Sequence, residues 1–92
     1  MKVIIHKVER NSFEKEGKVI RYCKFNVLKG IESTSDLIGS ESISYTTNYD
    51  NYEKIVNLYK MNKPVEITLA YKQIMTSGLY KEYVSKIDDI EL

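Results

Sequence analysis

Residues 19–28 have the sequence VIRYCKFNVL, in which two sets of side chains alternate. The first set is Val19, Arg21, Cys23, Phe25 and Val27, and the second is Ile20, Tyr22, Lys24, Asn26 and Leu28. Successive side chains of a β-strand point to opposite faces of the sheet. The stretch therefore predicts a half-buried strand. Its mostly apolar first set faces a core, and its second set presents an aromatic ring, a cation and an amide to solvent.

The segment before this strand predicts its hairpin partner. Residues 1–8 are rich in β-branched side chains and favour a strand. Residues 11–18 are mostly polar and contain Gly17, so we expect them to form the connection of a long hairpin. On the other side, residues 29–40 contain two Gly and four Ser or Thr, which favours a flexible loop.

The rest of the chain predicts one helix among strands. Tyr52, Ile55, Val56 and Tyr59 have the spacing of a helical stripe, and Pro64 ends that helix. The expected strands are residues 41–46, 65–72 and 79–92, with a turn near Ser77–Gly78 and an interruption near residues 85–89. The predicted fold class is all-β with one short helix, in a single domain over residues 1–92. The order strand, strand, strand, helix, strand, strand is typical of the five-stranded OB-fold barrel.

Composition bears on the class of protein. With one cysteine, Cys23, and one histidine, His6, the chain cannot form an internal disulfide or a four-thiolate zinc site. It contains no recognisable catalytic motif, so we expect a binding protein rather than an enzyme, with no cofactor and no metal. The longest apolar runs are too short to span a bilayer and no signal-peptide pattern is present, which favours a cytoplasmic protein without a membrane partner.

The charge is distributed unevenly along the chain. Residues 1–30 carry eight Lys or Arg and three Glu, a net charge of +5, whereas residues 31–92 carry six Lys and ten acids, a net charge of −4. A basic third joined to an acidic remainder points to a surface that faces a polyanion. The alternative is a hairpin whose charges only keep it solvated.

The last thirty residues carry a resemblance. Val65, Ile67 and Leu69, followed by Val84, Ile87, Ile90 and Leu92, resemble the closing strand pair of bacterial and phage single-stranded-DNA-binding proteins. In size and layout the chain is also similar to the strand-coating proteins of filamentous phages. The ending Asp88-Asp89-Ile90-Glu91-Leu92 is similar to that of the helicase-processivity factors of conjugative elements.

Sequence-independent binding of a single strand needs cations along a phosphate track and flat rings on which bases stack. The candidate nucleic-acid-binding residues are Lys18, Arg21, Tyr22, Lys24, Tyr45, Tyr80 and Lys81. For two of them a structural role is the alternative. Tyr45 shares a face with Ile43 and could belong to the core, and Arg21 could cap the barrel mouth. Tyr52, Tyr59 and Tyr71 are expected in the core.

The resulting hypothesis is non-sequence-specific binding of single-stranded DNA in the replication or transfer of a phage or mobile element. We expect a homodimer or a cooperative oligomer, since one small barrel contributes few cations, and replication proteins are further possible partners. One alternative is a protein-binding barrel, such as a phage-encoded inhibitor or a replisome adaptor. Another is a protein that binds duplex DNA or RNA.

Overall fold

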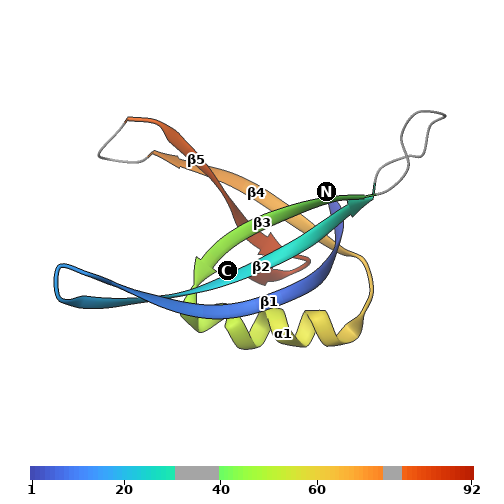
Figure 1. Ribbon diagram of the computed structural model, residues 1–92. Coiled ribbons are helices and arrows are strands. Elements are labelled where there is room, and N and C mark those ends of the chain that lie inside the picture. The colour runs from blue at the N-terminus through green and yellow to red at the C-terminus, as the bar shows by residue number, and fades with distance from the viewer. Residues whose placement is uncertain (31–39, 74–77) are drawn as a thin grey trace.

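The computed structural model describes residues 1–30, 40–73 and 78–92 (Figure 1). Its elements are β1 (Lys2–Lys15), β2 (Lys18–Gly30), β3 (Ser40–Asn48), η1 (Tyr49–Asn51), α1 (Tyr52–Met61), β4 (Val65–Gln73), β5 (Tyr80–Ile87) and β6 (Ile90–Glu91). The predicted order of three strands, a helix and two strands is confirmed, with the short β6 added at the end. The flexible loop predicted over residues 29–40 lies mostly outside the described residues, as does Ser77 of the predicted turn.

The β1–β2 hairpin is longer than the sequence predicted. Residues 11–18 do not form a polar connection, because both strands continue until Lys15 pairs with Lys18. The turn contains only Glu16 and Gly17, both with positive φ (52° and 76°). Two left-handed residues give a hairpin turn whose twist matches that of the strands it joins. This turn allows the pairing to run almost to the end of the hairpin.

The strands form one open antiparallel sheet with the order β3-β2-β1-β4-β5-β6. β1 lies at its centre, since it pairs with β2 along nearly its whole length and with β4 through Lys2 and Val3. The second half of the sheet folds back, so that the outer edge of β3 lies near β5 without forming a ladder with it.

The closed five-stranded barrel expected from the sequence is therefore not formed. Closure would require β5 to bond to β3, but the end of β5 is already paired on that side with β6. Ile87 pairs with Ile90, and the Leu92 N–H donates to the Ser85 carbonyl at 3.0 Å. The turn at Asp88 and Asp89, with Asp88 at a φ of 52°, turns the chain back along β5. The final segment thus occupies backbone groups at the C-terminal end of β5.

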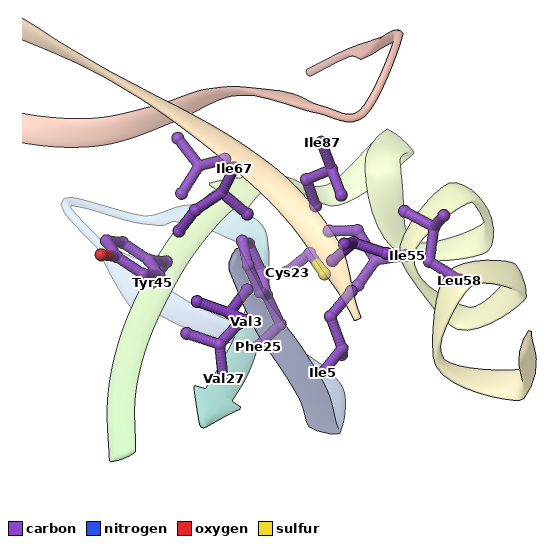
Figure 2. Packing of buried hydrophobic residues seen from close by; sticks show 12 residues of the cluster. Val3, Ile5, Cys23, Phe25, Val27, Tyr45, Ile55, Leu58, Ile67 and Ile87 are labelled. Carbon is purple, nitrogen blue, oxygen red and sulfur yellow. The ribbon is translucent and has the colours of Figure 1, made fainter. Parts of the chain in front are cut away.

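The core lies between the curved sheet and α1 (Figure 2). Cys23, Phe25 and Val27 are fully buried, so the predicted inner face of β2 is confirmed from Cys23 onward, whereas Val19 and Arg21, predicted on the same face, are exposed. Ile55 and Leu58 are the buried side chains of α1, which ends at Met61, before Pro64, as predicted. The prediction for Tyr59 and Tyr71 is wrong, because both rings are exposed, whereas Tyr52 is half-buried against the core.

Two hairpins extend beyond this core. Every residue from 11 to 20 is exposed, as is every described residue from 71 to 82. We call these segments the β1–β2 arm (residues 11–20) and the β4–β5 arm (residues 71–73 and 78–82). Figure 1 shows both arms leaving the sheet on the same side, where β3 also ends. The fold therefore places three strand ends around one region of the surface.

Candidate nucleic-acid interface

The middle of the outer face of β2, opposite the core, is polar around the Tyr22 ring. The register places three side chains in each row across β1, β2 and β3. The rows are Asn11–Tyr22–Asn48, Glu9–Lys24–Thr46 and Lys7–Asn26–Ser44. Amide and hydroxyl groups dominate these rows, and both Tyr22 and Lys24 are half-buried among them. The face offers hydrogen-bonding groups around a single ring.

That ring has a partner at the base of the β1–β2 arm. The centre of the Phe13 ring lies 5.9 Å from that of Tyr22, with the two planes at 57°. Such tilted pairs are a favoured aromatic geometry. Phe13 nevertheless stays 48% exposed. The two rings, Lys24 and Thr46 line a shallow pocket of about 320 Å³. An exposed ring beside a cation suits a flat ligand that carries negative charge.

The β4–β5 arm presents a pair of cations. Lys72 and Lys81 are direct cross-strand partners. Like charges placed opposite each other destabilise strand pairing. The Lys72 ammonium lies 5.8 Å from the centre of the Tyr83 ring, which can offset part of the repulsion by a cation–π contact. An anion between the two ammonium groups would remove the repulsion.

A pocket of about 260 Å³ lies between β3 and this arm. Its lining consists of Thr46, Thr47, Asn48, Lys72, Lys81, Tyr83, Val84 and Leu92. Thr46 also lines the pocket beside Phe13 and Tyr22, so the two pockets are neighbours at the end of β3. We call the two pockets together the groove. It has a ring pair on one side, polar β3 residues on its floor and a lysine pair on the other side.

The structure brings three of the sequence-predicted residues to the groove: Tyr22, Lys24 and Lys81. Lys18 lies apart from them, in the last cross-strand pair of the β1–β2 arm, and is exposed. Tyr80 is 71% exposed on the β4–β5 arm, but it points to the opposite face of β5 from Lys81.

Two other predicted residues lie away from the groove. Tyr45 is 8% exposed and packs on Phe25, with ring centres 5.8 Å apart. Burial, together with the charges of Glu82 and Glu41, raises the pKa of its hydroxyl. The expectation that Tyr45 offers a stacking surface is therefore wrong, and its alternative role in the core is correct. Arg21 lies on the helix side of β2, where its guanidinium is 5.7 Å from the centre of the Tyr49 ring.

The groove residues that were not predicted include Phe13, Thr46, Lys72 and Tyr83. Phe13 was assigned to a connection because its neighbours are polar on both sides. Thr46 was placed only at the end of a strand. Lys72 and Tyr83 belong to the two strands whose pairing brings Lys72 opposite Lys81. A search for cations on both sides of the turn near Gly78 would have found this pair.

Comparison with protein-family models, with curated proteins and with solved structures finds no match. Over the described residues, no cluster of His, Cys, Asp and Glu is suited to hold a metal ion. Within the same ranges, no helix is long and apolar enough to cross a membrane.

Proposed function

We propose that the protein binds single-stranded DNA without sequence specificity, in the replication or transfer of a phage or mobile element. One observation carries the proposal: the Phe13–Tyr22 pair and the opposed Lys72 and Lys81 line two neighbouring pockets that share Thr46. Unpaired bases can stack on the rings while the phosphates meet the cations.

The floor of the groove fits the same ligand. Thr46, Thr47 and Asn48 offer hydroxyl and amide groups between the ring pair and the lysine pair. Such groups contact phosphate and sugar oxygens and hold a strand in place without reading its sequence. A duplex has no free base faces to stack on the rings, so the arrangement favours a single strand.

We further propose that the fold is an open variant of the OB fold. The order β3-β2-β1-β4-β5 and the position of α1 between β3 and β4 support this assignment. OB folds bind oligonucleotides on the face of strands 2 and 3, between the loop joining strands 1 and 2 and the loop joining strands 4 and 5. Here the two arms take the places of those loops, and the groove lies between them.

A homodimer or a cooperative oligomer is part of the proposal, as is a cytoplasmic location with replication proteins as possible partners. The groove described above has space for only a short stretch of strand. Several copies that bind along one strand would together hold it more tightly than a single copy does. Val19 and Leu79, apolar side chains exposed on the two arms, offer surfaces for such contacts.

The experiment is a titration of labelled poly(dT), followed by fluorescence anisotropy at two salt concentrations, with a duplex of equal length as competitor. We expect poly(dT) to bind well ahead of the duplex. Tyr22→Ala should weaken binding by about 1–3 kcal/mol, the value of one stacked base, with little change in the salt dependence.

Tyr59→Ala serves as the matched control, because Tyr59 is an exposed ring on α1 that lines no part of the groove. Circular dichroism checks that both variants fold. Tighter binding of the duplex than of poly(dT), or equal affinity of Tyr22→Ala and the wild type, would contradict the proposal.

The second candidate function is a protein-binding domain. The exposed apolar side chains of the arms favour it, among them Val19, Leu79 and Tyr80. Exposed aromatic rings often anchor protein interfaces. No binding of poly(dT) or of duplex at low salt, in a folded protein, would favour this candidate.

A further inference from the structure

Arg10 and Arg21 lie on the side of the sheet away from the Phe13–Tyr22 pair. Arg10 pairs with Cys23 and Ser12 pairs with Arg21, so these side chains share the face that farther along β2 buries Cys23 and Phe25. Figure 1 shows β1 and β2 passing the start of α1 before they leave as the arm. The two arginines lie at this crossing, and nothing in the proposed groove involves them.

Aromatic rings of the helical segment hold both guanidinium groups. The Arg10 Cζ atom lies 4.6 Å from the centre of the Tyr52 ring, and the Arg21 Cζ atom lies 5.7 Å from that of Tyr49. A ring interacts with a cation through its face and accepts no strong hydrogen bond from the N–H groups. The ring therefore positions each guanidinium group and leaves its N–H donors available to a ligand.

Among the residues that the structure describes, no carboxylate forms an ion pair with either arginine. The ion pairs found over the described residues are those of the Met1 amino group with Glu66 and of Lys7 with Glu9. Asp50 and Glu53, beside the two tyrosines in sequence, form no ion pair with Arg10 or Arg21. Two neighbouring cations that lack an ion pair with the described carboxylates are available to an anion.

A pocket of about 300 Å³ opens between these groups. It is lined by Arg10, Asn11, Ser12, Arg21 and Tyr49. Its size is at the lower end of the range for small-molecule sites, so it suits a small charged group better than a large apolar ligand. The planar donor fork of arginine matches the oxygens of phosphate in particular.

We infer that this pocket binds a phosphate group through Arg10 and Arg21. The phosphate can come from a free phosphate or nucleotide, or from the backbone of a DNA strand that passes from the groove around the β1–β2 arm. Only the second source rests on the proposed function. In that case Tyr22 and Arg21, neighbours on opposite faces of β2, contact one strand from two sides.

The test measures pyrophosphate binding by calorimetry and by the shifts of the arginine side-chain N–H signals in NMR spectra. We expect binding by the wild type and a loss of about tenfold for each of Arg10→Gln and Arg21→Gln, since each removes a charged hydrogen-bonding partner. Lys60→Gln, the same charge change on α1, should leave binding unchanged. Tyr49→Leu keeps every cation but releases Arg21, and it should weaken binding by a smaller factor.

The thermal midpoint of each ligand-free variant shows that it is folded. Equal binding of pyrophosphate by the wild type and by folded Arg10→Gln/Arg21→Gln would overturn the inference, as would the absence of binding by the wild type. Poly(dT) titrations of the same variants show whether the bound phosphate belongs to a DNA strand or to a free ligand. A flatter salt dependence in the double variant supports a phosphate of the bound strand, and an unchanged one supports a free phosphate. Pyrophosphate binding without any poly(dT) binding would refute the proposed function but support the phosphate site at Arg10 and Arg21.

Discussion

The two arms are built on the same plan and differ in what their cross-strand pairs do. In the β1–β2 arm, Phe13 pairs with Ile20 across the strands and contacts the Tyr22 ring, so the pair beside the groove is attractive. The like-charged pair of this arm, Lys15 opposite Lys18, flanks its turn and lines no part of the groove. In the β4–β5 arm, the like-charged pair Lys72 and Lys81 lies in the groove itself and weakens the hairpin there. One arm thus offers the groove a ring pair that costs it no stability. The other offers charge at a cost to its stability, which points to a use for that charge.

The charge of the β4–β5 arm should account for most of the salt dependence of the groove. If Lys72 and Lys81 each neutralise one phosphate, Lys72→Ala/Lys81→Ala should lower the logarithmic salt slope by about 1.4, or about 0.7 per contact with a single strand. The affinity ratio of wild type to variant should then shrink roughly sevenfold between 50 and 200 mM salt. Anisotropy titrations with poly(dT) at several salt concentrations measure both quantities.

Lys60→Ala/Lys63→Ala is the matched control, because these exposed lysines lie at the end of α1 and just after it, away from the groove. An equal slope change in the control would show that only net charge matters. The contrast between the arms would then be wrong.

The sequence predicted some of these features and not others, for a physical reason. The inner and outer faces of β2 were predicted correctly from Cys23 onward, because burial of one face imposes an alternation of apolar and polar residues. The β1–β2 arm is exposed on both faces, so its strands lack that alternation and Phe13 was placed in a connection. The residues of β6 were predicted to be extended, as the end of the segment 79–92, but two residues carry too little pattern to show that they turn back and pair with β5.

Relief of the lysine repulsion should stabilise the β4–β5 arm. Lys81→Glu places a carboxylate opposite Lys72 and should raise the free energy of unfolding by about 0.2–1 kcal/mol, while it weakens binding of poly(dT). Urea unfolding at low salt measures the first effect. Lys60→Glu makes the same charge change without a cross-strand lysine and should lack the gain. A variant that loses stability would show that the two ammonium groups do not repel each other in the folded protein.

The smallest of the predicted effects concerns the face of the β4–β5 arm opposite to that of Lys72 and Lys81. There the Tyr71 hydroxyl donates a hydrogen bond to Glu82 Oε2 at 2.9 Å. This bond, and then the charge of Glu82, raises the pKa of Tyr71 above its ordinary value. A pKa raised in the folded state gives a stabilisation that is complete below the unfolded value of about 10 and is lost as the pH rises through the folded value. Because Tyr71 is 66% exposed, we expect only a small contribution, confined to this alkaline range.

Absorbance of tyrosinate measures the effect, as the difference between the wild type and Tyr71→Phe across the alkaline range. The difference is needed because Glu82 also raises the pKa of Tyr45, for which burial is the larger cause. We expect the midpoint assigned to Tyr71 to fall in the Glu82→Gln background, since a neutral amide keeps a hydrogen-bond acceptor but removes the charge. If the midpoint is the same in both backgrounds, the hydrogen bond does not persist in solution. The Tyr71–Glu82 pair would then add nothing to the backbone ladder that holds the β4–β5 arm against the lysine repulsion on its other face.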